Sequence, residues 1–304
     1  MAQYALRKRG VIEADIQIIR TSGDERVSRS ENAGSRGESV QVTSSGSLDF
    51  HADDLAAGKK GMFTAELERA LIEKRIDVAV HSAKDLPSEM DGALTIAATL
   101  SRAAVEDLLL RKSAALTPIT SIATGSVRRQ RQWRGVYPDA RIVPLRGTVP
   151  TRLRKFIESD WDAIILARAG LERLGFLPPQ FEFAGHRICA EILPIEKFVP
   201  AGGQGIIALQ TRAGDFSVHE IVSAVDDPQT HACLRAEREV LRLLHGDCDL
   251  PVGVHARFVN AEMELRVQVF GDTGVPKMAV GVGSDPTKLV PETFEKLEWE
   301  QEHG

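Results

Sequence analysis

A short polar segment, residues 80–87 (Val-His-Ser-Ala-Lys-Asp-Leu-Pro), follows the apolar stretch 76–80. The apolar stretch has the composition of a strand, which is expected to end at His81. Ser, Asp and Pro are common in turns, so the polar segment can be a plain exit from the strand. It can equally be a site at a strand end, where the Asp85 carboxylate faces a cation or a transferable proton.

Positive charge is concentrated in one part of a chain whose formal net charge is only −5. Residues 128–155 hold eight arginines and one lysine against one acid, Asp139, so the rest of the chain carries −13. The turn at residues 124–130 (Thr-Gly-Ser-Val-Arg-Arg-Gln) leads into a predicted helix, and free N–H groups at a helix start suit carboxylates or phosphates. Arg146-Gly147-Thr148 and Arg152 repeat the pattern. Because arginine is preferred for bidentate anion recognition, a bound anion is favoured over a merely solvated cationic surface.

Nucleic acid is the competing anionic partner. The basic segment offers only Trp133 and Tyr137 for base stacking, and aromatic residues make up 5% of the chain. Single-stranded nucleic acid binding usually combines basic grooves with stacking platforms. We therefore expect a small anion and no nucleic acid.

Three cysteines are too few for a disulfide framework, which favours a reducing compartment. Cys248 lies in a loop rich in Gly, Asp and Pro, residues 246–253. Neighbouring acids raise the pKa of a thiol, so Cys248 is predicted to be a covalent attachment point rather than a nucleophile that turns over. Cys189 and Cys233 are predicted to be structural. The histidines show no metal-ligand spacing, so no metal is expected.

A glycine-rich segment, residues 203–208, satisfies the pattern G-x-G-x-x-A. It comes late in the chain and lacks the acidic strand end that a dinucleotide site requires about 20 residues further on. It is therefore predicted to be a turn between domains.

The polar segments need a scaffold of alternating strands and helices. Strands are predicted at residues 15–20, 76–80, 94–99, 107–111, 141–145 and 163–167. Helices are predicted at residues 2–8, 62–74, 127–136, 149–159 and 169–174. This alternation favours an α/β fold with parallel, doubly wound sheets that bind ligands at the carboxyl ends of strands. Residues 21–48 show no such periodicity and are predicted to form a long lid or a disordered loop.

The C-terminal part of the chain changes character. A helix at residues 228–244 precedes strands at 252–259, 264–270 and 278–282, and a final helix covers 286–301. This pattern predicts a separate α+β module. No apolar run approaches the ~18 residues of a membrane helix. Residues 1–10 carry charges where a signal peptide has its apolar core, so a cytoplasmic protein without a membrane partner is expected.

Taken together, these segments resemble the hydroxymethylbilane synthase (porphobilinogen deaminase) family. The matching segments, in chain order, are residues 58–63, 80–87, 124–130, 145–149, 162–167, 169–171, 200–205 and the Cys248 loop. The resemblance spans about residues 18–270. It implies a transferase of tetrapyrrole biosynthesis, which joins four units of its substrate porphobilinogen head to tail, releases ammonia at each step and frees hydroxymethylbilane by hydrolysis.

The resemblance also implies roles for individual residues. Asp85 would be catalytic, assisting deamination and stabilising the azafulvenium cation. Cys248 would carry a dipyrromethane cofactor through a thioether bond. Further cofactor contacts are implied for Ser82, Lys84, Asp85, Thr124, Ser126, Arg128, Arg129 and Gly147. Substrate contacts are implied for Lys60, Phe63, Arg146, Arg152, Arg173 and Gln204.

The family fold has two periplasmic-binding-protein-like domains and a smaller α+β domain that bears the cysteine. On this chain the implied boundaries are residues 1–101 with 201–217 for domain 1, 102–200 for domain 2 and 218–304 for domain 3. Domain 1 would hold the catalytic aspartate and the lid loop, and domain 2 the arginine-rich carboxylate-binding segment. The family is usually monomeric, so a monomer is expected.

The chain departs from the family pattern in three places. The opening Gly-Thr-Arg-x-Ser-x-Leu-Ala type motif has no counterpart, and Met1-Ala2-Gln3 aligns with the helix that follows it. Either the start of this sequence was assigned too late, or the first strand of domain 1 is missing together with an anion-binding Arg/Ser pair. The lid loop at residues 21–60 is longer than usual, and Asp247 replaces a glycine. Two alternatives stay open: a non-catalytic anion-binding protein of the periplasmic-binding-protein type, and a degenerate, inactive paralogue.

Overall fold

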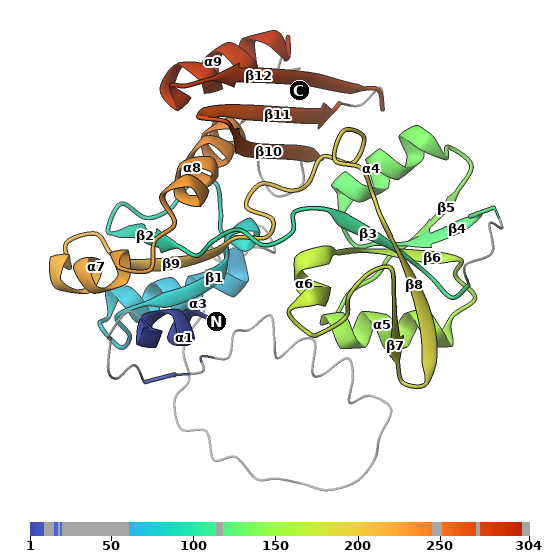
Figure 1. Ribbon diagram of the computed structural model, residues 1–304, viewed down its shortest axis with the longest axis horizontal. Helices are drawn as coiled ribbons and strands as arrows, with labels where there is room; N and C mark the ends of the chain where they lie inside the picture. Colours follow the sequence, from blue (N-terminus) through green and yellow to red (C-terminus); the bar gives the residue numbers. More distant parts are fainter. Residues whose placement is uncertain are drawn as a thin grey trace, which may run out of the picture.

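The computed structural model describes residues 1–8, 15–17, 19, 61–113, 118–244, 251–271 and 274–299, except for the side chains of residues 61–63. Figure 1 shows three separate β-sheets, each with helices packed against it. Each sheet has its own clusters of buried apolar side chains. The molecule is a mixed α/β protein with a separate C-terminal domain, as the sequence predicts.

The first sheet has the strand order β1-β9-β2. Its strands are β1 (Ala79–Ser82), β9 (Ile207–Arg212) and β2 (Leu94–Thr99). Three helices accompany it: α1 (Ala2–Lys8), α3 (Gly61–Ile72) and α7 (Phe216–Ser223). Both outer strands pair with β9 in antiparallel fashion, so β1 and β2 run parallel to each other with β9 between them.

The second sheet has the order β5-β4-β6-β3-β8-β7. Its strands, along the chain, are β3 (Asp107–Arg111), β4 (Ser121–Ala123), β5 (Arg141–Val143), β6 (Ala163–Ala167), β7 (Gln180–Phe183) and β8 (His186–Ile192). Its helices are α4 (Val127–Val136), α5 (Val149–Glu158) and α6 (Arg168–Glu172). Leu108 and Leu110 pack with Phe156 of α5 in one buried cluster, whereas Leu109 packs with Trp133 of α4 in another. Because side chains alternate along a strand, the sheet is covered on both faces, which explains its continuous apolar strands.

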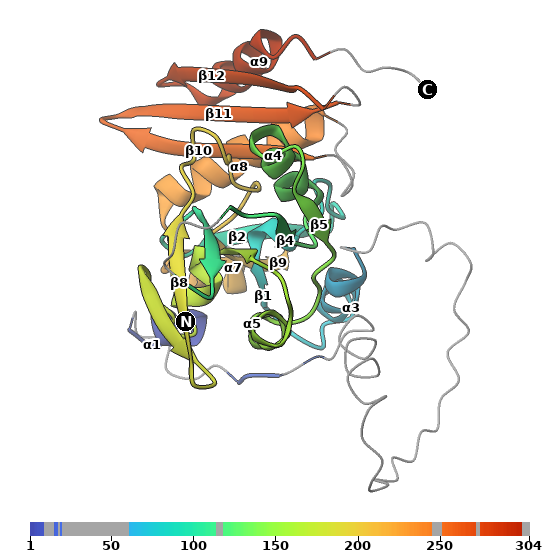
Figure 2. The ribbon, with the colours of Figure 1, turned by 90° about the vertical axis from the view of Figure 1, so that its right-hand side faces the viewer.

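The third sheet is an antiparallel meander of β10 (Val252–Val259), β11 (Glu262–Phe270) and β12 (Pro276–Gly283). Helices α8 (Pro228–Leu243) and α9 (Pro286–Lys296) pack against it. A Cβ on Gly281 would lie 2.0 Å from Thr293 Oγ1, so glycine there lets α9 approach β12 closely. Figures 1 and 2 both place this domain at one end of the molecule, against the other two sheets.

Most predicted elements are present, and the bounds of α1, β2, β3, β6, α4 and β10 match the prediction. The prediction of parallel sheets is wrong for the first sheet, because β9 returns from the second sheet and inserts between β1 and β2 in the opposite direction. In the second sheet, β4 is parallel to β5 and β6, whereas β3 is antiparallel to its neighbours. Strands β4, β7, β8 and β9 and helix α7 were not predicted.

Two N-terminal predictions fall wholly or partly outside the described residues. Of the strand predicted at residues 15–20, only 15–17 and 19 are described, and these have no regular secondary structure. The loop predicted at residues 21–48 lies entirely outside the described residues.

The chain passes from the first sheet to the second through Arg102 and returns through Gly203. Both crossovers contact Glu237 of α8, in the C-terminal domain. Its side chain is fully buried and accepts a hydrogen bond from Arg102 Nη1 at 2.6 Å. The backbone N–H groups of Gly203 and Ala256 donate to the same carboxylate, each at 2.7 Å. One carboxylate therefore joins both crossovers to β10.

Candidate active site

The segment after β1 forms a 3₁₀ helix, η3 (Ala83–Asp85), which turns the chain out of the first sheet. The Ala83 N–H donates to the Ile206 carbonyl at 3.0 Å. Gly203 has a φ of +72°, and a Cβ there would lie 2.8 Å from the backbone nitrogen of Lys84. Only glycine permits this approach. The glycine-rich turn is therefore the support for the segment that carries Lys84 and Asp85.

Side chains of β1 and η3 differ in their exposure. The Asp85 carboxylate is exposed and makes no hydrogen bond or ion pair within the described ranges, and Ser82 at the end of β1 is half-buried and caps nothing. His81 is buried, with Nε2 2.9 Å from Gln210 Oε1. Burial lowers the pKa of His81, so its imidazole is neutral at pH 7. The exposed Asp85 carboxylate is therefore open to a ligand.

The start of α4 provides a second part of the site. Ser126 is the N-cap of this helix, and its Oγ accepts from the Arg129 N–H at 3.5 Å. Thr124 is buried, and its Oγ1 accepts from the Ser126 N–H at 3.3 Å. A Cβ on Gly125 would lie 2.5 Å from the Leu145 carbonyl oxygen. The turn before α4 thus packs directly against the chain that leads into Arg146 and Gly147.

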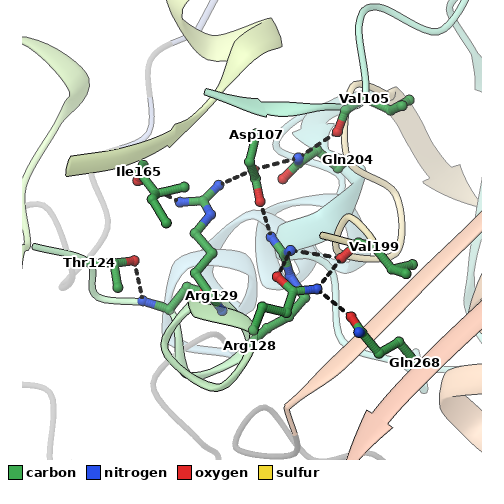
Figure 3. Close-up of polar contacts among 11 residues, drawn as sticks. Val105, Asp107, Thr124, Arg128, Arg129, Ile165, Val199, Gln204 and Gln268 are labelled. Carbon is green, nitrogen blue, oxygen red and sulfur yellow. Dashed lines mark hydrogen bonds and ion pairs between the residues drawn. The ribbon is translucent and has the colours of Figure 1, made fainter. Parts of the chain in front are cut away.

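Arg128 and Arg129 are both buried and share one counter-ion, Asp107 at the start of β3 (Figure 3). Arg128 Nη2 lies 2.9 Å from Asp107 Oδ2, and Arg129 Nη2 lies 2.7 Å from Oδ1. Arg128 Nη1 also donates to Gln132 Oε1 and to the Val199 carbonyl. Burial alone would raise the pKa of Asp107, but the two guanidinium groups hold that pKa well below its usual range.

Lys84 lies within the field of these charges. Burial lowers the pKa of Lys84 to about 8. Asp85 and Asp107 oppose this shift, whereas Arg129 and Arg128 add to it. The ammonium group makes no hydrogen bond or ion pair with the part of the chain that the structure describes. Lys84 is therefore a cation at neutral pH that can still take a ligand.

The turn before α5 adds Arg152. Thr148 caps this helix, Gly147 has a φ of +119°, and Arg152 Nε donates to the Gly147 carbonyl at 2.6 Å. Burial lowers the pKa of Arg152; Arg129 lowers it further and Asp85 raises it. The charges of Arg129 and Asp85 are thus close enough to Arg152 to shift its pKa. Arg146 is exposed, and its guanidinium has no partner among the described residues.

Lys84 and Asp85 from the first sheet and Arg129 and Arg152 from the second form what we call the charged cluster. Two further predicted residues contact the glycine-rich turn or Asp107. Arg173 Nη2 donates to the Gly205 carbonyl at 2.9 Å. Gln204 is buried, and its Nε2 donates to the Val105 carbonyl and to Asp107 Oδ1.

The basic segment 128–155 does not form one continuous surface. The Arg128 guanidinium is used by internal partners, and Arg141 lies at the surface, 3.5 Å from Asp160. The cause is that these residues come from different elements: Arg128 and Arg129 of α4 face inward to Asp107, whereas Arg141 begins β5 at the surface. Three predicted site groups, Lys60, the Phe63 side chain and Cys248, lie outside the described residues.

Asp107 is the residue of this region that the sequence did not reveal. It is followed by Leu108, Leu109 and Leu110, so it reads as the polar first residue of an ordinary strand. The available signal was an acid at a strand start in a chain with an unpaired Arg-Arg doublet. A sequence contains no distances between residues, so it could not show that Asp107 pairs with Arg128, 21 residues further along the chain.

The charged cluster combines three cations with one carboxylate that has no partner among the described residues. Arginine and lysine bind carboxylates through charge-assisted hydrogen bonds, and a carboxylate accepts from N–H groups or offsets a cation. The arrangement therefore suits a ligand that carries several carboxylates and also N–H groups. Among the described residues there is no group of histidine, cysteine and acidic side chains that could hold a metal ion, and no helix long and apolar enough to cross a membrane.

Sequence comparison shows which known proteins this chain is similar to. Residues 1–220 match the family model "Porphobilinogen deaminase, dipyromethane cofactor binding domain", and residues 231–280 match "Porphobilinogen deaminase, C-terminal domain". The porphobilinogen deaminase of Roseiflexus castenholzii is 38% identical over 263 residues, 84% of each chain. That of Acidithiobacillus ferrooxidans is 38% identical over 257 residues, 83% of this chain and 81% of the relative.

Solved structures give a much weaker likeness. The periplasmic VFT2 domain of Bordetella pertussis BvgS is 17% identical over 53% of this chain and 66% of that chain, with a TM-score of 0.32. A TM-score this low carries no weight. The family models span both the sheets with the charged cluster and the C-terminal domain, so the chain belongs to the porphobilinogen deaminase family.

Proposed function

We propose that the charged cluster is where this porphobilinogen deaminase assembles hydroxymethylbilane, with Asp85 as its catalytic carboxylate. The enzyme is a transferase that joins porphobilinogen units with loss of ammonia. The observation that carries the assignment is an exposed carboxylate, free of described partners, beside Lys84, Arg129 and Arg152. The alternative of a non-catalytic anion-binding protein is not favoured, because curated relatives named as the enzyme match most of the chain.

The cluster fits the dipyrromethane cofactor of this family by charge and by hydrogen bonding. Each pyrrole ring of that cofactor carries an acetate, a propionate and an N–H group. Lys84, Arg129 and Arg152 offer cationic donors for the carboxylates, and Asp85 offers an acceptor for the N–H groups. When bound through Cys248, the cofactor supplies the terminal pyrrole carbon to which the first substrate unit is joined.

Asp85 has three tasks at its carboxylate oxygens. It accepts hydrogen bonds from pyrrole N–H groups and so orients the ring. It offsets the positive charge that develops on porphobilinogen as the amino group leaves as ammonia. It then receives the proton that is lost when the new carbon–carbon bond has formed. One exposed carboxylate can perform these tasks in sequence because each needs the same position beside the ring.

We assign the surrounding residues to cofactor and substrate on the same chemistry. Cofactor contacts are assigned to Ser82, Lys84, Asp85, Thr124, Ser126, Arg128, Arg129 and Gly147, with Arg128 acting from behind the site because its guanidinium is held by internal partners. Substrate contacts are assigned to Lys60, Phe63, Arg146, Arg152, Arg173 and Gln204. Within the second set, Arg146 and Arg152 are supported most directly, since both keep guanidinium N–H groups free of described partners. Gln204 is supported as a residue that acts from behind the site.

We further propose three domains, with domain 1 at residues 1–101 and 201–217, domain 2 at 102–200 and domain 3 at 218–304. The three separate sheets and their separate apolar clusters support this division, except that helix α7 crosses the boundary at residue 217 and packs with the first sheet. We also propose that the enzyme acts in the cytoplasm as a monomer, in keeping with its cysteine content.

Intact mass tests the proposed function. Protein produced in cells that make porphobilinogen is expected to be heavier than its sequence by one dipyrromethane unit. Cys248→Ser is expected to have the unmodified mass, because serine lacks the thiolate that forms the thioether. Cys189→Ser is the matched control, since Cys189 lies on β8 and should keep the added mass. An unmodified wild-type protein would refute the assignment, and loss of the mass in Cys189→Ser instead would refute the anchor.

The pKa of Lys84 predicts a pH dependence for substrate binding. Lys84 carries a positive charge below about pH 8 and loses it above that pH. The KM for porphobilinogen is therefore expected to rise between pH 7 and pH 9.5, with the steepest change near pH 8. Lys84→Arg keeps its charge throughout this range, so the step near pH 8 should vanish in that variant. The same step in Lys84→Arg would show that another group titrates.

A further inference from the structure

Asp107 stands where three parts of the chain meet (Figure 3). It starts β3 of the second sheet and is completely buried. Each oxygen of its carboxylate binds one guanidinium, from Arg128 or Arg129 of α4. Oδ1 also accepts from Gln204 Nε2 at 2.9 Å, which connects it to the crossover returning to the first sheet. No other carboxylate in the described part of the chain binds two buried arginines.

The two arginines depend on this carboxylate for their positions. Adjacent buried guanidinium groups repel each other, and burial itself lowers the pKa of Arg128, which Asp107 opposes. The Arg129 side chain has one further hydrogen bond, from Nη1 to the Ile165 carbonyl, and its buried Nε has no partner among the described residues. Asp107 is therefore the charged group that fixes the orientation of Arg129.

The influence of Asp107 reaches the first sheet by two routes. Gln204 follows Gly203, whose backbone packs against Ala83 and Lys84. The negative charge of Asp107 also acts on Lys84, along with Asp85 of η3 and with Arg128 and Arg129 of α4. Asp107 thus affects the position of Arg129 on the second sheet and the pKa of Lys84 on the first sheet.

We propose that Asp107 is a positioning residue of the active site. It fixes the positions of Arg129 and of the crossover that contains Gln204, so that the cations of both sheets face one carboxylate-bearing ligand. It acts through these residues and does not touch the ligand itself. This inference rests on the proposed function, because the ligand in question is the oligopyrrole that the charged cluster binds.

The test measures loading of cofactor-free protein with porphobilinogen, followed by intact mass over a range of substrate concentrations and from pH 6 to pH 9.5. Asp107→Asn is expected to need at least about tenfold more porphobilinogen for half-maximal loading, since it loses the charge-assisted hydrogen bond to Arg129. The alkaline decline in loading should also move to lower pH. The sign follows from the charge: a carboxylate near Lys84 raises its pKa, so removing the carboxylate lowers that pKa.

Asp162→Asn is the matched control for lost stability alone. Asp162 is also an aspartate of the second sheet, and its Oδ2 accepts four hydrogen bonds from Thr120 and Ser121. It is not among the charged groups that shift the pKa of Lys84 most. Asp162→Asn should therefore lower the melting temperature while leaving the pH limit of loading unchanged. An unchanged loading curve and pH limit in Asp107→Asn would overturn the inference.

Asp107→Glu provides the second variant if Asp107→Asn does not fold. It keeps the charge but moves the carboxylate by one methylene group. The pH limit should stay near that of the wild type, whereas half-maximal loading should still need more porphobilinogen. Wild-type loading in Asp107→Glu would overturn the positioning role. Failure of the wild type itself to gain mass would refute the proposed function instead, so the two failures are distinguishable.

Discussion

Replacing Asp85 by alanine is expected to lower the rate of hydroxymethylbilane formation by about 10²–10⁴-fold, the range for loss of a positioned acid–base group. The fold should survive, because the Asp85 carboxylate is exposed and holds no described part of the chain in place. Asp85→Glu should also lose most of its turnover, since the longer side chain moves the charge away from the reacting ring. The measurement is product formation per cofactor-loaded enzyme, with circular dichroism as the check on folding.

Glu89→Ala is the control for this prediction. Glu89 is an exposed acid in the same segment of domain 1, so its removal changes the local charge equally. It should turn over at the wild-type rate. Normal product formation by Asp85→Ala or Asp85→Glu would remove Asp85 from the mechanism. A loss in Glu89→Ala of similar size would show that the effect is one of general charge.

Replacing Glu237 by glutamine is expected to destabilise the protein by about 3–5 kcal/mol, the cost of leaving one member of a buried ion pair without its partner. Glu237 is fully buried, and its partner Arg102 is 12% exposed, so water screens the pair little. The carboxylate also accepts from the Gly203 and Ala256 N–H groups. An amide N–H₂ would face some of these donors and could accept from none of them.

The change in stability can be measured as the shift in the urea midpoint. Glu239→Gln on the same helix is the matched control. Glu239 also pairs with an arginine, Arg242, but about half of each side chain is exposed, so its removal should leave the midpoint almost unchanged. Equal midpoints for Glu237→Gln and the wild type would mean that the crossovers and the C-terminal domain are joined by other contacts.

The elements whose bounds could be predicted are those with a strong local pattern. β3 and β6 are covered on both faces and show uninterrupted apolar residues, and α4 and α5 begin at the capping residues Ser126 and Thr148. β4 has only three residues, and β9 directly follows a glycine-rich turn, so neither has a periodic pattern of its own. Short strands are completed by their neighbours, which sequence periodicity does not reveal.

The candidate site likewise has some features that the sequence predicts and others that only the fold shows. The polar segment with Lys84 and Asp85 and the Arg128-Arg129 doublet stand out in the sequence because their residue types are suited to carboxylates and protons. The net charge of the basic segment also pointed to an anion. It gave no sign that Arg128 faces inward, because charge counts contain no direction.

The sequence by itself thus determined the residue types available for chemistry, the local elements that carry them and the resemblance to one enzyme family. The tertiary structure decided which of these residues act together. Asp107 meets Gln204 across 97 positions of the chain, and β9 separates β1 from β2, because the chain returns from the second sheet to the first. Local patterns report that a group is buried. Only the assembled fold decides which buried donor meets which acceptor, since that depends on the distances between elements far apart in the chain.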